Sequence, residues 1–187
     1  MSDHIIFPEE FPELKSERIH LSSLGPQDVD AYFDMRSDVE FMKYLGRDPM
    51  KSKSEARDRL SSMIEDFKRG EGISWKISLA QNDQLIGYIG FWRIDFKNRR
   101  AEIGFGLQAA HQNQGFMTEA LKLIVEFGFQ EMKIHSIMAD SDPRNKPTLH
   151  LLEKVGFKKE AYLRENYFYS GEFLDSVYYG VLVSDLN

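Results

Sequence analysis

Apolar residues recur at two different spacings along this chain, and the two spacings separate predicted helices from predicted strands. Spacings of three and four residues predict amphipathic helices, and Phe116, Ala120 and Ile124 form the clearest such series. Alternation of apolar and polar residues predicts strands, as in residues 18–21. The predicted helices cover residues 27–36, 39–44, 52–69, 116–127 and 147–155. The predicted strands cover residues 18–21, 74–80, 85–94, 100–109, 136–139, 157–169 and 173–183.

The order of these elements predicts the fold class. Three strands follow one another in the middle of the chain, with turns expected at residues 82–83 and 97–98, which is typical of an antiparallel meander. Strands and helices alternate after it, and a turn at residues 170–171 joins the last two strands. We therefore expect one α/β (α+β mixed) domain over residues 15–187, with a mixed, largely antiparallel sheet and helices on both faces. Residues 1–14 are predicted to form a loosely attached leader.

Composition and charge exclude several classes of function. The 187 residues carry 24 Lys and Arg against 30 Asp and Glu, and this acidic balance argues against broad binding to nucleic acid. The absence of cysteine excludes disulfides and a cysteine nucleophile. No apolar run reaches the roughly 18 residues of a membrane span, so we expect a cytoplasmic protein without membrane contact. The five histidines show no metal-ligand spacing, so no metal site is expected, and either a monomer or a homodimer fits.

The most informative segment is Gln112-Asn113-Gln114-Gly115-Phe116-Met117, between a predicted strand and a predicted amphipathic helix. The first turn of a helix has free backbone N–H groups, and its dipole favours an anion there. Gly115 permits close approach of a ligand or a positive φ. The segment lacks both the dinucleotide fingerprint and the Walker loop. It is a plausible phosphate cradle, although a single glycine in this position is also a common connector.

Four segments in order resemble the GNAT superfamily of N-acetyltransferases, and within it the ribosomal-protein N-terminal acetyltransferase (RimJ/RimL-like) branch. The family loop Gln/Arg-x-x-Gly-x-Gly/Ala is matched by Gln112, Gly115 and Met117, with Met117 where Gly or Ala is usual. The strand before this loop, residues 102–107, and the helix start after it, residues 118–121, also match. Residues 145–157 fit the branch pattern Asn-x-x-Ser-x-x-Leu-x-Glu-Lys-x-Gly-Phe. The resemblance covers nearly the whole chain and implies a GNAT-like fold.

The resemblance implies acetyl-CoA as cosubstrate and a direct, ternary-complex transfer. It implies that the strand from residue 102 splays from the next strand, so that its main chain binds the pantetheine arm and polarises the acetyl carbonyl. Asn145 bridges the cofactor arm and a helix start, or is a simple N-cap. Met117 does not crowd the diphosphate if its side chain points to the core. The implied cofactor-binding residues are Phe105, Leu107, Gln112, Asn113, Gln114, Gly115, Phe116, Met117, Thr118 and Asn145.

Two residues are candidates for proton transfer. Glu102 is the candidate base, and it shares a strand face with Gly104 and Gly106, whose missing side chains would leave room for a substrate. The alternative is that Glu102 is structural and pairs with the arginines at 99 or 100. Thr148 occupies the hydroxyl position of the branch and could donate a proton to the thiolate, or it could satisfy its own helix backbone.

The acceptor implied by the resemblance is the α-amine of a protein N-terminus, such as that of a ribosomal protein. A small amine such as a polyamine, an amino sugar or an amino acid is the alternative, and a catalytically silent acyl-CoA-binding domain is a third reading. Many GNAT enzymes use a tyrosine as proton donor where this chain has Leu152, so that role does not transfer. Glu165 and Tyr167, in the last predicted hairpin, could contact the acceptor.

Overall fold

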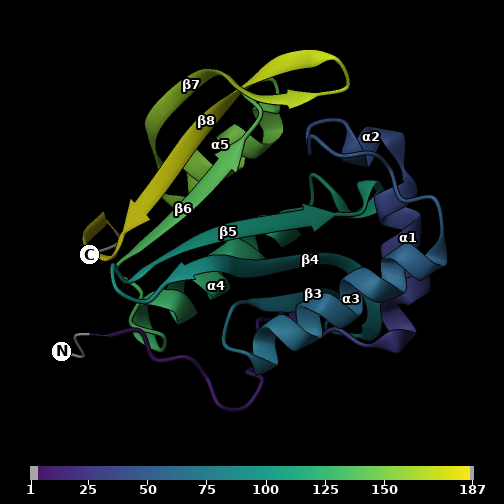
Figure 1. Ribbon diagram of the computed structural model, residues 1–187. Helices are drawn as coiled ribbons and strands as arrows, with labels where there is room; N and C mark the ends of the chain where they lie inside the picture. Colours follow the sequence, from purple (N-terminus) through teal and green to yellow (C-terminus); the bar gives the residue numbers. More distant parts are fainter. Residues whose placement is uncertain (1–3, 186–187) are drawn as a thin grey trace.

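The computed structural model describes residues 4–185 (Figure 1). The strands are β1 (Leu14–Lys15), β2 (Ile19–Ser23), β3 (Ile73–Leu79), β4 (Asn82–Asp95), β5 (Arg100–Leu107), β6 (Ser136–Ser141), β7 (Lys158–Tyr169) and β8 (Glu172–Leu182). The helices are α1 (Val29–Ser37), α2 (Val39–Met42), α3 (Lys53–Lys68), α4 (Phe116–Gln130) and α5 (Lys146–Val155). Short 3-10 turns precede α1 and follow β5 and β8.

The eight strands form one sheet in the order β1-β2-β3-β4-β5-β6-β8-β7. Only β5 and β6 pair in parallel, because α4 crosses over between them, and every other neighbouring pair is antiparallel. The core has two clusters, one joining the sheet to α4 and α5 and the other joining it to α1 and α3. These helices lie on opposite faces of the sheet (Figure 1). The predicted fold class is therefore confirmed.

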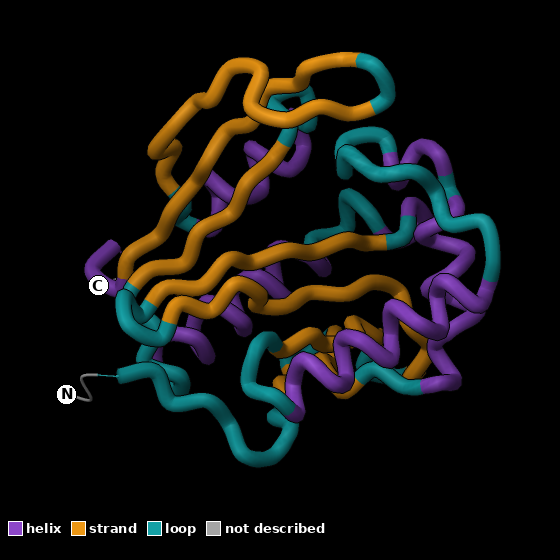
Figure 2. The backbone as a smooth tube through the Cα atoms, viewed as in Figure 1, coloured by secondary structure: helices purple, strands orange, loops and turns teal. Residues whose placement is uncertain are grey.

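The sheet opens between β5 and β6. Their parallel pairing runs from Arg100↔Ser136 to Glu102↔Met138 and then stops, although β5 continues for five more residues. Beyond that point the two strands diverge, and β6 continues with β7 and β8 as a separate wing (Figure 2). The predicted splay of the strand that starts near residue 102 is present. It leaves one edge of β5 without a strand partner, and this gap positions the candidate site.

The segment before β1 is not loosely attached, so that expectation is wrong for residues 5–12. Ile5 is 5% exposed and belongs to the main core. Phe11 packs against the Trp75 ring at 5.7 Å between centroids, and the Trp75 indole N–H donates to the Pro12 carbonyl at 2.7 Å. Burial of these apolar side chains removes them from water, which favours a packed segment. Residues 1–3 lie outside the described part of the chain.

Two smaller expectations also change. The turn expected at residues 82–83 lies at residues 80–81, and Asn82 begins β4 opposite Leu79. The Asn82 side chain accepts a hydrogen bond from the Gln84 N–H, so a residue typical of turns is accommodated in the strand. The two-residue strand β1 was not predicted, because it is too short to show alternation. The turn at residues 97–98 is confirmed.

Candidate active site

The loop from residue 112 to residue 118 joins the turn after β5 to the start of α4. Gly115 is the residue before α4 and has φ +85, which confirms the predicted positive φ. Asn113 also has a positive φ, of 60. No side chain of residues 4–185 caps this end of α4, so its first N–H groups are available to a ligand. The local geometry is that of an anion-binding turn.

Arg18, which directly precedes β2, holds this loop from outside. Its Nη1 donates to the Gln114 carbonyl at 3.0 Å, and its Nη2 lies 2.7 Å from the Glu119 carboxylate. The guanidinium also stacks over the Phe116 ring at 4.9 Å. The contacts of this one side chain therefore span the loop and the first turn of α4. The sequence showed no sign of this role, because Arg18 is about a hundred positions away in the chain.

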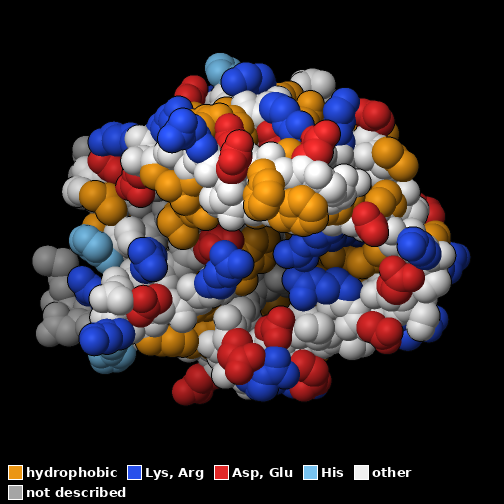
Figure 3. All heavy atoms as spheres, turned by 45° about the horizontal axis from the view of Figure 1, so that its top comes forward, with side chains coloured by type: hydrophobic (Ala, Val, Ile, Leu, Met, Phe, Trp, Pro, Cys, Tyr) orange, Lys and Arg blue, Asp and Glu red, His pale blue; other side chains and the backbone are white. Residues whose placement is uncertain are grey.

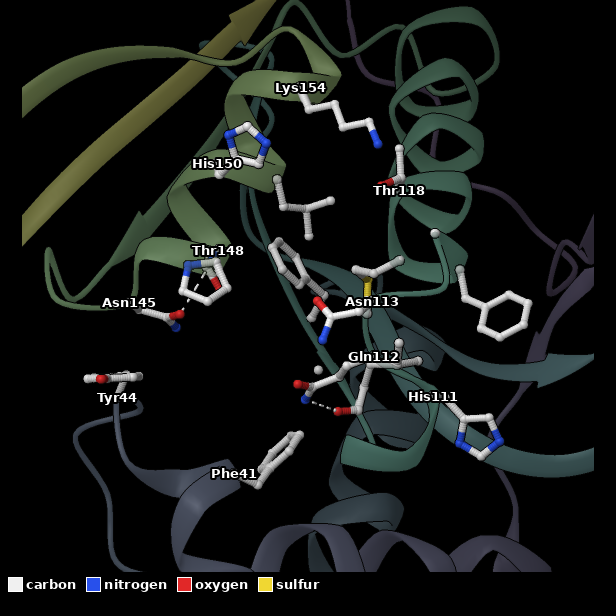
Figure 4. A pocket seen from close by; sticks show the side chains of 18 of the residues that line it. Phe41, Tyr44, His111, Gln112, Asn113, Thr118, Asn145, Thr148, His150 and Lys154 are labelled. Carbon is white, nitrogen blue, oxygen red and sulfur yellow. Dashed lines mark hydrogen bonds between the residues drawn. The ribbon is translucent and has the colours of Figure 1, made fainter.

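A cleft of about 540 Å³, here called the loop cleft, lies between this loop, the end of β5 and the start of α5 (Figure 4). It brings together most of the predicted cofactor residues, together with His150 and Lys154 of α5. Gln114 does not line it, because its side chain donates to the Ala110 carbonyl and its own carbonyl accepts from Arg18. The predicted residues that line it are Phe105, Leu107, Gln112, Asn113, Gly115, Phe116, Met117, Thr118, Asn145 and Thr148.

Two loop residues have clear structural roles. The Gln112 amide donates to the Leu107 carbonyl at 2.9 Å, which ties the loop back to the end of β5 (dashed in Figure 4). Met117 is 7% exposed and belongs to the main core cluster. Its bulk is therefore accommodated by the core, which is the arrangement in which a residue larger than Gly or Ala does not crowd the diphosphate.

Asn145 and Thr148 stand at the start of α5. The Asn145 Oδ1 accepts from the Thr148 N–H at 3.4 Å, which is the N-cap predicted as one of its two roles. Its Nδ2 is the part of the side chain left for a ligand. No hydrogen bond from the Thr148 hydroxyl to the α5 backbone occurs within residues 4–185, so the predicted self-satisfaction of this hydroxyl is not observed. The half-buried hydroxyl is available to a bound molecule.

A second cavity of about 690 Å³, here called the sheet cavity, lies on the other side of this junction, between the diverging strands, α1 and the β7–β8 hairpin. Glu102 lines this cavity and not the loop cleft. The residues that line both are Tyr44, Leu45, Phe105, Asn145 and Thr148. Two molecules bound in the two spaces would therefore meet beside Asn145 and Thr148.

Glu102 is buried, and both of its carboxylate oxygens are engaged. The Trp92 indole N–H donates to Oε1 at 2.6 Å, and Arg93 Nη1 donates to Oε2 at 2.9 Å. Glu102 does form an ion pair, as the alternative role predicted, but its partner is Arg93 and not an arginine at 99 or 100. A bulge between Trp92 and Asp95 and a φ of 46 at Arg93 let two consecutive side chains reach one carboxylate.

The space beside Gly104 and Gly106 is narrower than the sequence suggested, although Gly104 lines the sheet cavity and Gly106 lines the loop cleft. A Cβ at Gly104 would overlap the Trp92 ring, and a Cβ at Gly106 would lie 2.5 Å from the Phe41 ring. Aromatic side chains occupy part of the room that the two glycines leave. The absence of a side chain at 104 lets Trp92 lie across β5 and reach Glu102.

Asp140 of β6 is a second carboxylate in the sheet cavity, and the sequence analysis missed it. Enclosure by the cavity, with the negative charge of Glu102, raises the pKa of Asp140. Enclosure and the negative charges of Asp140 and Glu102 raise the pKa of Tyr178, which also lines the cavity. Tyr167 reaches the cavity as well, whereas Glu165 does not line it. The sequence shows only an acidic residue directly after a predicted strand, and the position of Asp140 where β5 and β6 separate is known from the structure.

Two features are absent from the described residues. Within residues 4–185 no three His, Asp or Glu side chains are grouped so as to hold a metal ion. None of the helices in that range combines the length and the apolar character needed to cross a bilayer.

Comparison with known proteins places this geometry in a family. The model of the acetyltransferase (GNAT) domain matches residues 18–158. The uncharacterized N-acetyltransferase p20 of Bacillus licheniformis is 34% identical, with 90% of this chain and 95% of that protein covered. The structure of spermidine N-acetyltransferase from Vibrio cholerae in complex with CoA and spermine has a TM-score of 0.81 at 24% identity, covering 92% of this chain and all of that one.

Mycobacterium smegmatis RimJ in complex with CoA-disulfide has the same fold, with a TM-score of 0.81 at 19% identity over 90% of this chain and 83% of that one. The family model spans both the loop and the start of α5. The chain therefore belongs to the GNAT family and is an acetyl-CoA-dependent N-acetyltransferase.

Proposed function

We propose that this enzyme transfers acetyl from acetyl-CoA directly to the α-amine of a protein N-terminus, with both substrates bound together. The observation that carries the proposal is the junction of the two cavities at Phe105, Asn145 and Thr148. A thioester that enters through the loop cleft and an amine that enters through the sheet cavity would meet there. Proximity of this kind supplies much of the rate enhancement in group transfer.

The loop cleft fits acetyl-CoA. The free N–H groups at the start of α4 face the position proposed for the pyrophosphate, and the Lys154 side chain points toward Thr118 across the cleft (Figure 4). The edge of β5 from Phe105 to Leu107 has no strand partner, so its main chain can bind the pantetheine arm. An N–H group on that edge would stabilise the oxyanion that forms on the acetyl carbonyl.

The sheet cavity supplies the carboxylates for proton transfer. The amine nitrogen attacks the thioester carbonyl carbon, the C–S bond breaks, and the amine proton passes to Glu102 directly or through water. Asp140 is the second acceptor for that proton, because it has no ion-pair partner within the described chain. The Thr148 hydroxyl, at the junction, donates a proton to the departing thiolate directly or through water. Thr148 then regains a proton from water and Glu102 releases the amine proton to water, so the net change is transfer of the acetyl group and release of CoA as the thiol.

The choice of a protein N-terminus rests on chemistry and on the similar proteins. An α-amine has a pKa near 8 and is partly neutral at physiological pH, whereas a lysine side chain near 10.4 is not. A cavity of about 690 Å³ accepts several residues of an extended chain. The fold shared with RimJ supports this acceptor. The second candidate is a small amine such as a polyamine, supported by the similar spermidine N-acetyltransferase and by the carboxylates Glu102 and Asp140.

A thiol-release assay tests the proposal. Purified protein with acetyl-CoA is offered N-terminal peptides, spermidine, glucosamine and free amino acids, with a sample lacking acceptor as control. We expect CoA release only with an acceptor, and the highest kcat/KM with peptides. A preference for spermidine would replace the peptide with a polyamine, and binding of acetyl-CoA without turnover on the whole panel would refute the transfer itself.

A further inference from the structure

Arg36 of α1 is a buried cation in the wall of the sheet cavity. It is 8% exposed, its Nη1 donates to the Tyr88 hydroxyl at 3.1 Å, and its Nε is buried without a hydrogen-bond partner. Arginine at physiological pH is always charged, and a buried charge is costly unless it is paired. No pattern in the sequence pointed to this residue.

Arg36 has no ion-pair partner within residues 4–185, while other charges around the cavity do. Arg93 pairs with Glu102, and two further lining carboxylates are occupied, Asp66 by Arg69 and Asp142 by Arg144. These three carboxylates are thus engaged elsewhere, and Asp140, which also lines the cavity, forms no ion pair with Arg36 within the described chain. A buried guanidinium left with an unfilled donor in a cavity wall is a site for an anion.

Arg59 of α3 adds a second positive charge at the same end of the cavity. Burial and Tyr88 raise the pKa of the Tyr32 phenol, and the charges of both Arg36 and Arg59 oppose that rise, so both guanidinium groups lie near this ring. Arg59 is half-buried and forms no ion pair within the described chain. The space-filling view shows a hollow in this face of the molecule, with Lys and Arg side chains on both sides of its mouth (Figure 3).

The positive and negative ends of the cavity are separated along β4. Arg36 is hydrogen-bonded to Tyr88, and Glu102 is hydrogen-bonded to Trp92. These two β4 residues lie four positions apart on one face of the sheet, which is about 13 Å at 3.3 Å per residue. Phe105, which lines the junction, pairs with Ile89 between them. An amine at the junction therefore has Glu102, paired with Arg93, on one side and Arg36 on the other.

We propose that the acceptor carries an anionic group, a carboxylate or a phosphate, a few bonds from its amine, and that this group pairs with Arg36 and Arg59. The inference rests on the proposed function and narrows its acceptor. Two sources have this chemistry: a protein N-terminus with an acidic residue at the first or second position, and a small anionic amine. A polycation such as spermidine would place a positive charge beside Arg36 and is disfavoured.

The test compares acceptors that differ only in the anion. The peptide pair is Ser-Glu-Ala-Ala and Ser-Gln-Ala-Ala, both with an amidated C-terminus, and the small-molecule pairs are β-alanine with β-alaninamide and phosphoethanolamine with ethanolamine. We expect kcat/KM for the anionic member of at least one pair to exceed that of its neutral partner by about 10- to 100-fold. The pair that shows the larger ratio identifies the source of the anion.

The variants Arg36→Gln and Arg59→Gln should each reduce this ratio toward one while leaving the KM for acetyl-CoA unchanged, and Arg36→Lys should keep part of it. Arg57→Gln is the matched control, because Arg57 is an exposed arginine of α3 that does not line the cavity and should keep the full ratio. Arg59 is less buried than Arg36, so Arg59→Gln still tests the inference if Arg36→Gln fails to fold.

Two results would overturn the inference while the proposed function stands: equal kcat/KM within every pair, or a ratio that survives both Gln variants. If no amine is acetylated, the proposed function fails. Calorimetric titration of the two peptides into the CoA-loaded protein then decides the inference separately. Tighter binding of Ser-Glu-Ala-Ala that is lost in Arg36→Gln supports it, and equal or absent binding refutes it.

Discussion

The Arg18 guanidinium and the Glu119 carboxylate lie 2.7 Å apart, although 101 positions separate them in the chain. The same guanidinium donates to the Gln114 carbonyl. A residue just before β2 thus fixes both the loop and the first turn of α4, where backbone N–H groups face the proposed pyrophosphate site. Arg18 is a positioning residue, because its contacts are with the loop and not with the cleft.

We expect Arg18→Ala to weaken acetyl-CoA binding about three- to tenfold, because loss of charge-assisted bonds worth about 1 kcal/mol leaves the loop less ordered. Calorimetry with CoA measures this change, and kcat at saturating acetyl-CoA should stay within about twofold of the wild type. Lys15→Ala is the control, since Lys15 is exposed and pairs with Glu13 away from the loop. CoA affinity unchanged in Arg18→Ala would show that the loop holds its shape without this contact.

Gly115→Ala should lower both stability and acetyl-CoA affinity. A side chain at φ +85 costs about 1–2 kcal/mol, and the loop would relax away from the conformation that presents its N–H groups. Gly171→Ala is a matched control, because Gly171 has φ +87 in the distant β7–β8 turn and no atom near a new Cβ. Both variants should lose similar unfolding free energy in urea, but only Gly115→Ala should lose CoA affinity. Equal CoA affinity in the two variants would argue against the phosphate assignment.

Glu102→Gln should reduce kcat by about 10²- to 10⁴-fold, the usual contribution of a general base, while CoA affinity changes less than about twofold. The amide keeps the shape of the side chain and can still accept a hydrogen bond from Trp92, so large unfolding is not expected. Glu172→Gln, on the exposed start of β8, should behave as wild type. Turnover unaffected in Glu102→Gln would remove this residue from the mechanism and leave Asp140 as the base.

Asp140→Asn should separate activity from stability. The pKa of Asp140 is raised in the folded protein, so folding favours its protonated form and the charged form at neutral pH opposes folding. The variant should therefore be more stable at pH 7, by no more than about 1 kcal/mol because the carboxylate still contacts water. The gain should vanish as the pH falls below the unfolded pKa of Asp, where both states are protonated.

The activity of the same variant should be lower than that of the wild type, and the acidic limb of its kcat/KM profile should change if Asp140 takes up the amine proton. Urea unfolding at pH 7 and pH 3.5, together with the pH–rate profile, measures both effects. Asp175→Asn should have the opposite sign on stability, because hydrogen bonds from Tyr162 and the Glu165 N–H lower the pKa of Asp175. A less stable Asp140→Asn protein would contradict the argument.

Thr148→Ala should lower kcat about tenfold or more if its hydroxyl protonates the thiolate, and Thr148→Ser should restore most of the rate. The cap would persist in both variants, because it uses the Thr148 backbone N–H and the Asn145 side chain. Circular dichroism and CoA affinity should therefore stay constant. A Thr148→Ser enzyme as slow as Thr148→Ala would show that the methyl group, and hence packing, is what matters.

Local features of the site were predictable, and the encounters between distant segments were not. Gly115 before an amphipathic helix and Asn145 before the next helix are short-range signals, and both lie where they were expected. The pairing of Glu102 with Arg93 depends on a bulge in β4, and no residue spacing in the sequence predicts that bulge. The position of the Trp92 ring over Gly104 was also not predictable, because cross-strand neighbours depend on the register of the paired strands.

The sequence by itself determined the order of helices and strands, the mixed sheet and the loop that begins α4, because hydrophobic period, glycine and capping residues act over a few positions. Only the tertiary structure decided what surrounds the acceptor. Arg36, Asp140 and Trp92 come from three different elements, and the gap between β5 and β6 brings them into one cavity. Strand register and long-range packing bring these three side chains together, and both are properties of the whole folded chain.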